Sequence, residues 1–277
     1  MPDISPRAIV EASAGLAEDV QVGPFCHVGP EVKIGPGTVL HAQVTVTGRT
    51  TIGARCQIFP GCVVGAAPPG VGCDDAAACT IADDNVLREH VVVEAGADRS
   101  GPGTVFGEGN LLMVGSYVGH DATLEGHGIF PNFTRIEPHA RVEPFVQTAG
   151  FTVVRPYVTV GAYAFTTGYA DVARDVPPYA IVQGLPARVR SVNSEKLRRC
   201  GFDEDTIAAL RKAFHLLFNR NGAAPDAQRL ATALEEFPNE HVGILIDSLR
   251  QAAASPSGRR LAPPRTPEGG NGYVQPD

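Results

Sequence analysis

Two histidines and an aspartate have the residue types and the spacing of an acid–base centre. His120 and Asp121 are adjacent, and His139 follows Asp121 by 18 positions. An imidazole with an ordinary pKa of about 6.5 can remove a proton from a hydroxyl group at neutral pH. A neighbouring carboxylate can fix the tautomer of that imidazole and stabilise its protonated form. These residues therefore predict a centre that activates a hydroxyl nucleophile.

An aliphatic residue at every sixth position indicates the scaffold that holds this centre. An α-helix or a lone strand does not have this period, whereas hexapeptide-repeat parallel β-helices do. We expect the periodic side chain to point into a narrow prism, and the glycine that often follows it to let the backbone turn the corner. The series is Leu16, Val22, Val28, Ile34, Leu40, Val46, Ile52, Ile58 and Val64, then Ile81, Leu87 and Val93, then Phe106, Leu112, Val118, Leu124, Phe130, Ile136, Val142, Thr148, Val154, Val160, Thr166 and Val172. The predicted fold class is an all-β left-handed parallel β-helix with a C-terminal α-helical domain.

Stacking of the coils brings the candidate residues together. One coil contains three hexads, so residues 18 positions apart lie one above the other, separated by about 4.8 Å. Asp121 should therefore lie under His139, with His120 one position aside. Two Gly/Pro-rich segments, about 66–79 and about 95–104, interrupt the register. We expect both to be loops that leave the rigid scaffold and contact substrate.

Composition and pattern set the domain boundaries and exclude several functions. The chain has 277 residues, no tryptophan and a net charge of −7, which argues against binding to nucleic acid. We find no signal peptide and no apolar run long enough to span a membrane, and we expect a cytoplasmic protein. The six cysteines form no metal-binding spacing and are expected to be buried small apolar residues. The predicted domains are a β-helix over 1–188, a helical domain over 189–254 and a disordered tail over 255–277.

The helical domain is expected to contain three helices. Asp203 should cap the first, a second should begin near Pro225 and Asp226, and a third should carry Val242 and Ile246. The tail is rich in proline and glycine and poor in apolar residues, which is the basis for expecting disorder.

Several motifs resemble one family, the UDP-N-acetylglucosamine O-acyltransferases, over about residues 5–250. The motifs are Gly23-Pro24-Phe25, Arg88-Glu89, Gly109-Asn110-Leu111-Leu112-Met113, Gly119-His120-Asp121, Asp175-Val176-Pro177-Pro178-Tyr179, Gln183-Gly184 and Leu197-Arg198-Arg199 to Gly201-Phe202. The resemblance implies a homotrimer with active sites between subunits. It also implies transfer of a 3-hydroxyacyl chain from acyl carrier protein to the 3-hydroxyl of UDP-N-acetylglucosamine, the first step of lipid A synthesis. It implies neither a cofactor nor a metal ion.

The resemblance also assigns roles residue by residue. His120 matches the general base of the family and Asp121 the aspartate that follows it. Matches to substrate-binding positions are His139, Gly168 at the site that measures acyl length, and the nucleotide-contacting residues Asn193, Glu195 and Arg199.

The sequence departs from the family pattern around the site. Pro138 stands where the family has a glycine whose backbone N–H serves as oxyanion donor, and proline has no N–H. The segment Pro68-Pro69-Gly70-Val71-Gly72 replaces a sugar-contacting loop. Tyr117 and Arg155 replace family histidines, and Cys200 replaces a basic residue.

Two alternative functions remain open at this level. One is a catalytically weak paralogue that binds acyl carrier protein or a sugar nucleotide without turnover. The other is a metal-dependent hexapeptide enzyme similar to the γ-class carbonic anhydrases. That class needs three imidazoles at a subunit interface, and His120 and His139 supply two.

Overall fold

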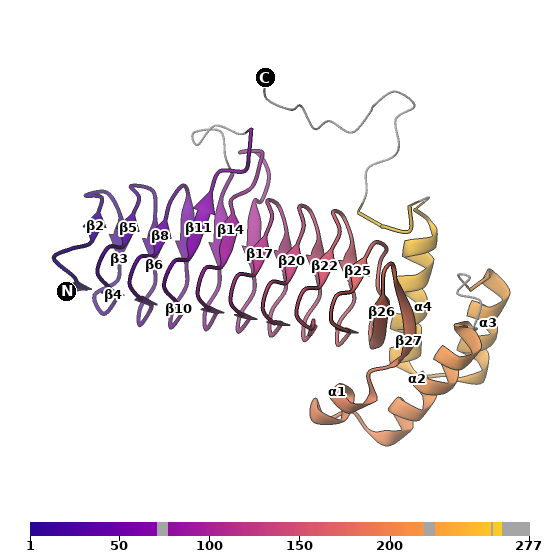
Figure 1. The fold of residues 1–277 in the computed structure, drawn as a ribbon. Coiled ribbons are helices and arrows are strands. Elements are labelled where there is room, and N and C mark those ends of the chain that lie inside the picture. The colour runs from indigo at the N-terminus through magenta and orange to yellow at the C-terminus, as the bar shows by residue number, and fades with distance from the viewer. Residues whose placement is uncertain (71–76, 219–224, 256, 262–277) are drawn as a thin grey trace.

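The chain folds into a triangular prism of stacked coils with helices packed at one end (Figure 1). The computed structural model describes residues 1–70, 77–218, 225–255 and 257–261. Each strand pairs in parallel with the strand of the next coil, so that Val39 pairs with Gln57 and Tyr117 with Arg135, each 18 positions apart. The hexapeptide period therefore correctly predicted a left-handed parallel β-helix followed by helices.

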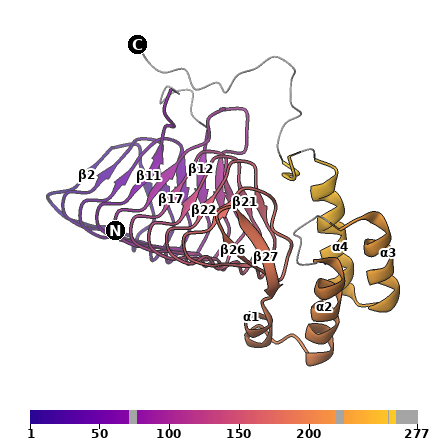
Figure 2. The ribbon, with the colours of Figure 1, turned by 45° about the vertical axis from the view of Figure 1, so that its right-hand side comes forward.

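Three sheets form the faces of the prism (Figure 2). The first sheet contains β1 (Asp3–Ile4), β4 (Gln21–Val22), β7 (Val39–Leu40), β10 (Gln57–Ile58), β13 (Val86–Leu87), β16 (Leu111–Leu112) and β19 (Ile129–Phe130). The second contains β2 (Ile9–Val10), β5 (His27–Val28), β8 (Thr45–Val46), β11 (Val63–Ala66), β14 (Val92–Glu94), β17 (Tyr117–Val118), β20 (Arg135–Ile136), β22 (Val153–Val154) and β25 (Asp171–Val172). The third contains β3 (Gly15–Leu16), β6 (Lys33–Ile34), β9 (Thr50–Ile52), β12 (Cys79–Ile81), β15 (Thr104–Phe106), β18 (Thr123–Leu124), β21 (Arg141–Val142) and β23 (Thr159–Val160).

The periodic side chains fill the prism. From Val22 to Val172 they are almost completely buried, and Phe106 and Phe130 are the largest among them. The two threonines in the series are also buried, and each bonds to a second threonine: Thr148 to Thr134 and Thr166 to Thr152, both at 3.0 Å between hydroxyl oxygens. A row of small side chains thus forms a continuous core without the large residues of a globular domain.

The glycines that follow the periodic residues do not act as we expected. The left-handed backbone conformation that turns each corner falls two positions later, at Phe25 (φ 61°) after Gly23 and at Asp121 (φ 57°) after Gly119. The glycine is instead needed because the next coil passes close by. A Cβ added to Gly119 would lie 2.7 Å from Cδ of Pro138.

The cysteines are mostly buried, as expected. Cys26, Cys56, Cys62 and Cys79 lie in the interior, whereas Cys200 is exposed because it follows a surface helix. Cys73 lies outside the described residues.

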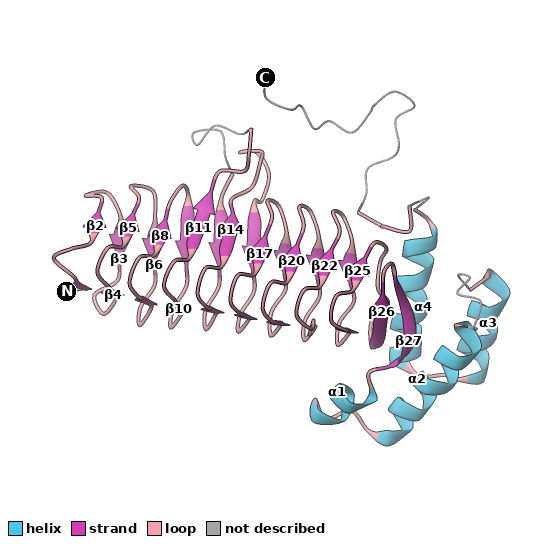
Figure 3. Cartoon of the chain, viewed as in Figure 1, coloured by secondary structure: helices cyan, strands magenta, loops and turns pink. Residues whose placement is uncertain are grey.

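The last coil leads into the helical domain (Figure 3). β26 (Ala180–Gly184) pairs in parallel with β24 (Phe165–Thr166) and antiparallel with β27 (Ala187–Val192). The helices are α1 (Ser194–Arg199), α2 (Glu204–Leu217), α3 (Ala227–Glu236) and α4 (Glu240–Ala253). The short α1 was not expected. α2 and α3 begin where the sequence predicted, and α4 contains Val242 and Ile246 as expected. None of these helices is long and apolar enough to cross a lipid bilayer.

The predicted cap and the junction with the β-helix follow from side-chain hydrogen bonds. The Asp203 carboxylate accepts a bond from the backbone N–H of Thr206 at the start of α2, and Asp226 caps α3 in the same way. The Tyr179 hydroxyl lies 3.0 Å from Nδ1 of His241 in α4, which connects the last coil to the helices.

The first residues of the expected disordered tail are ordered and pack on the β-helix. Arg259 Nε donates to the carbonyl oxygen of Ala173 at 2.8 Å. Arg260 donates from its backbone N to Asp175 at 2.9 Å and from its guanidinium to Glu143 at 2.5 Å. The expectation of disorder is wrong for this segment, because charged hydrogen bonds hold it where apolar burial is lacking. Residues 262–277 lie outside the described part of the chain.

Candidate active site

The acid–base residues lie at the edge of the prism between the second and third sheets. His120 and Asp121 form the corner between β17 and β18. Both interrupting segments leave the same edge, since one connects β11 to β12 and the other connects β14 to β15. They also contact each other, with the Ala77 N–H donating to the carbonyl oxygen of Gly96 at 2.8 Å. The predicted excursions are thus confirmed and adjoin the predicted centre, while Val71 and Gly72 lie outside the described residues.

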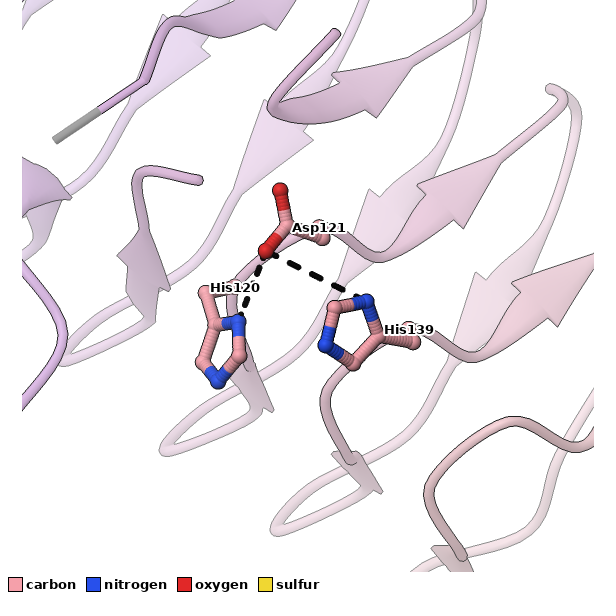
Figure 4. A group of neighbouring side chains, drawn as sticks. All are labelled: His120, Asp121 and His139. Atoms are coloured by element: carbon pink, nitrogen blue, oxygen red, sulfur yellow. Dashed lines mark hydrogen bonds and ion pairs between the residues drawn. The ribbon is translucent and has the colours of Figure 1, made fainter. Parts of the chain in front are cut away.

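A short hydrogen bond joins His120 to Asp121 (Figure 4). Nδ1 of His120 lies 2.8 Å from Oδ2 of Asp121. A carboxylate can only accept, so the proton is on Nδ1 and the lone pair is on Nε2. The His120 side chain is 23% exposed, so a substrate can reach it. The pair has the arrangement of a general base with its orienting carboxylate.

His139 lies in the next coil and faces the same carboxylate (Figure 4). Its Nδ1 is 4.0 Å from Oδ2 of Asp121, and its ring meets that of His120 edge to face at 4.9 Å. The Tyr157 ring stacks on it at 4.6 Å. Burial, and to a smaller extent the charge of His120, lower the pKa of His139 against the opposing effect of Asp121. His139 is therefore neutral at neutral pH and suited to hydrogen bonding with a substrate.

Glu94 and Thr104 belong to this site although the sequence did not single them out. Oε2 of Glu94 accepts a bond from the His120 backbone N–H at 3.1 Å, and Oγ1 of Thr104 accepts one from the Asp121 N–H at 2.9 Å. Oδ2 of Asp121 also accepts a bond from the Ala97 N–H at 3.1 Å. Glu94 and Thr104 lie at the two ends of the second excursion. Because this excursion breaks the 18-residue register, stacking of coils could not predict which residues they contact.

Pro138 lies directly above this corner, and the backbone N–H of the residue after it is already engaged. The N–H of His139 donates to the carbonyl oxygen of His120 at 3.0 Å. The His139 N–H therefore does not replace the backbone donor that is missing at Pro138.

Gly168 lies at a different edge from His120 within one chain. It is in the corner between β24 and β25, which is the edge between the first and second sheets. It is exposed, and an added Cβ would meet only the carbonyl oxygen of Gly150 at an ordinary 3.5 Å. The backbone does not require glycine there.

The three candidate nucleotide-contacting residues also lie apart from His120, around α1. Asn193 precedes α1 and donates from Nδ2 to the carbonyl oxygen of Tyr163 at 2.8 Å. Glu195 and Arg199 form an exposed ion pair at 3.1 Å. The structure thus brings together His120, Asp121 and His139 and leaves the other candidates elsewhere on the same chain.

The other departures from the family pattern have local partners. The Tyr117 hydroxyl faces the Glu94 carboxylate. Burial, and to a smaller extent the charge of that carboxylate, raise the pKa of Tyr117. The guanidinium of Arg135 lies 4.6 Å from the centre of the Tyr117 ring. Arg155 pairs with Asp171 at 2.6 Å.

In the described part of the chain, His120, Asp121 and His139 are the one group of three or more His, Cys, Asp or Glu residues that could hold a metal ion. One ligand atom each from His120, Asp121 and His139 lies within 4.8 Å of the others. Two imidazoles are fewer than the three that the metal-dependent alternative needs from an interface. Asp121 also already accepts bonds from His120 and Ala97, an arrangement that fits an acid–base pair.

The fold and the site define a hexapeptide-repeat acyltransferase, and comparison with known proteins gives the family. Residues 13–48 match the model described as bacterial transferase hexapeptide (six repeats), and residues 175–259 match domain 2 of UDP N-acetylglucosamine O-acyltransferase. The acyl-[acyl-carrier-protein]–UDP-N-acetylglucosamine O-acyltransferase of Stutzerimonas stutzeri is 36% identical over 250 residues, which are 89% of this chain and 96% of that protein.

Solved structures agree. LpxA from Acinetobacter baumannii superposes with a TM-score of 0.80 at 32% identity, covering 90% of this chain and 96% of that one. LpxA from Bacteroides fragilis, a UDP-N-acetylglucosamine acyltransferase, gives a TM-score of 0.84 at 28% identity and covers 89% and 96%. The chain belongs to the UDP-N-acetylglucosamine O-acyltransferase family.

Proposed function

We propose that this protein transfers a 3-hydroxyacyl chain from acyl carrier protein to the 3-hydroxyl of UDP-N-acetylglucosamine, in the cytoplasm, as the first step of lipid A synthesis. The observation that carries the proposal is the 2.8 Å contact between His120 Nδ1 and Asp121 Oδ2, at the edge where both excursions leave the prism. It supplies a base whose free nitrogen can take a proton from a sugar hydroxyl.

The reaction follows from this geometry. Nε2 of His120 removes the proton of the sugar 3-hydroxyl while that oxygen attacks the thioester carbonyl carbon. The imidazolium formed is stabilised by Asp121. Collapse of the tetrahedral intermediate breaks the carbon–sulfur bond, and the departing thiolate takes the proton from His120. The ester and the free thiol then leave, and His120 returns to its starting state.

A second copy of the chain would complete the site. Gly168, Asn193, Glu195 and Arg199 lie away from His120 in one chain, which supports their being supplied to that base by a neighbour in a homotrimer. The outward side of the first sheet carries the half-buried apolar residues Val86, Leu111 and Ile129, and Phe165 of β24 continues this row. Such a surface is suited to being covered by another subunit.

The test is incubation of pure protein with UDP-N-acetylglucosamine and a series of 3-hydroxyacyl carrier proteins, with detection of the sugar ester by mass spectrometry. We expect ester with at least one chain length. Absence of product across the series, with the trimer intact, would contradict the proposal. Calorimetric titration with UDP-N-acetylglucosamine would then identify the weak paralogue, since that alternative retains binding without turnover.

A further inference from the structure

Side chains, rather than carbonyl groups of the coil below, accept the backbone N–H groups of His120 and Asp121. In the next two coils, the position stacked on His120 is Pro138 and then Pro156, which have no N–H and need no partner. At His120 the N–H is present, and the Glu94 carboxylate accepts it at 3.1 Å. Glu94 thus satisfies a donor for which this corner of the β-helix offers no regular acceptor.

The neighbouring residue shows the same exchange of a backbone acceptor for a side chain. In the regular coils the corner N–H donates to a carbonyl of the coil below: His139 to His120 at 3.0 Å, and Tyr157 to Pro138 at 3.2 Å. At Asp121 the coil below has left the ladder, and Oγ1 of Thr104 accepts the bond at 2.9 Å. Both acceptors therefore come from the ends of the excursion between β14 and β15.

The two acceptors are themselves fixed. Glu94 is 7% exposed and Thr104 is fully buried. Glu94 also faces the Tyr117 hydroxyl, and the Tyr117 ring lies against the Arg135 guanidinium. A buried carboxylate without polar partners would be costly, so the bond from the His120 N–H and the neighbouring Tyr117 hydroxyl account for its presence.

We propose that Glu94 and Thr104 are positioning residues of the acyl transfer, which hold the backbone of His120 and Asp121 so that Nε2 of His120 is aimed at the acceptor hydroxyl. The inference rests on the proposed function for its kinetic consequence. Because a displacement of about 1 Å can reduce the rate about 10²-fold, loss of either acceptor should act on kcat.

Three variants test this in the full-length trimer. Glu94→Ala should lower kcat by about 10- to 100-fold with KM changed less than about threefold. Glu94→Gln should recover most of that loss, because its amide oxygen can still accept the His120 N–H. Thr104→Val, which keeps the shape and removes the acceptor, should resemble Glu94→Ala. Glu125→Gln is the matched control, since Glu125 also follows a periodic residue but pairs with Arg141 on another corner.

Hydrogen exchange provides a measurement that does not need turnover. In Glu94→Ala the amide of His120 should exchange at least about tenfold faster, while the ladder amide of Gly119, bonded to Ile136 at 2.8 Å, should not change. If wild-type protein lacks activity but His120 exchange responds, the proposed function fails and the positioning of this backbone stands. Unchanged His120 exchange in a folded Glu94→Ala trimer, or full kcat in an active one, would overturn the inference.

Discussion

At the scale of single residues, the chemistry depends on His120 and on whatever stabilises the oxyanion. The base has its orienting carboxylate at 2.8 Å, but the corner above it contains Pro138. The His139 N–H beside that proline is committed to the His120 carbonyl. The oxyanion therefore lacks the backbone donor that the family resemblance indicates at this position.

Pro138→Gly should therefore accelerate acyl transfer. Glycine restores an N–H at the position stacked on His120, and one oxyanion donor typically contributes about 10²–10³ in rate. Steady-state kinetics with the preferred acyl chain should show the increase in kcat. A folded, trimeric variant with no gain would show that another group serves as the donor or that the acceptor pocket is altered.

His139 should make stability depend on pH in a defined direction. Burial lowers the pKa of His139 in the folded protein, so the folded state binds fewer protons than the unfolded chain, whose histidines have a pKa of about 6.5. Stability should fall as pH decreases from about 7 through that value. In His139→Asn this contribution is absent, and unfolding temperatures measured between pH 5 and 7.5 should vary less steeply. An equal slope in both proteins would contradict the assignment.

The sequence was sufficient to predict that His120, Asp121 and His139 lie close together, because their spacing matches one coil. It was not sufficient for Glu94, whose partner His120 is 26 positions away. The excursion after Glu94 breaks the 18-residue count, so its neighbours could not be derived by stacking. Gly168 and Arg199 could be assigned only by resemblance, since one chain does not bring them to the base.

At the scale of elements, the hexads and the helix caps are local patterns and were predictable. The docking of residues 257–261 was not, because it depends on Glu143 and Asp175, which lie 117 and 85 positions before Arg260. Composition alone suggested disorder for the whole tail. The structure shows a charged segment that returns from α4 to the edge of the prism.

Arg260→Ala should loosen this return. The Arg260 and Glu143 side chains are 17% and 21% exposed, so their bond is better shielded than a surface ion pair. We expect a loss of about 1–2 kcal/mol, or about 2–8 °C in unfolding temperature. Arg250→Ala removes an exposed pair with Asp247 and should have little effect by comparison. Equal shifts in the two variants, measured by calorimetry, would show that the segment adds nothing specific.

At the scale of the whole molecule, the outer faces of the prism carry apolar side chains that remain partly exposed in a single chain. The apolar side chains on the first sheet and the separation of Gly168 from His120 both support assembly around a threefold axis. Light scattering should give the mass of a homotrimer at micromolar concentration. A stable folded monomer there would contradict this arrangement and leave the site incomplete.

The most direct test of the account is the kinetics of His120→Ala beside the wild-type protein. A general base contributes about 10²–10⁴ to the rate, so kcat for ester formation should fall by at least about 10²-fold while the trimer and its unfolding temperature are retained. Near-normal turnover in an intact His120→Ala trimer would show that the base lies elsewhere and would contradict the central claim.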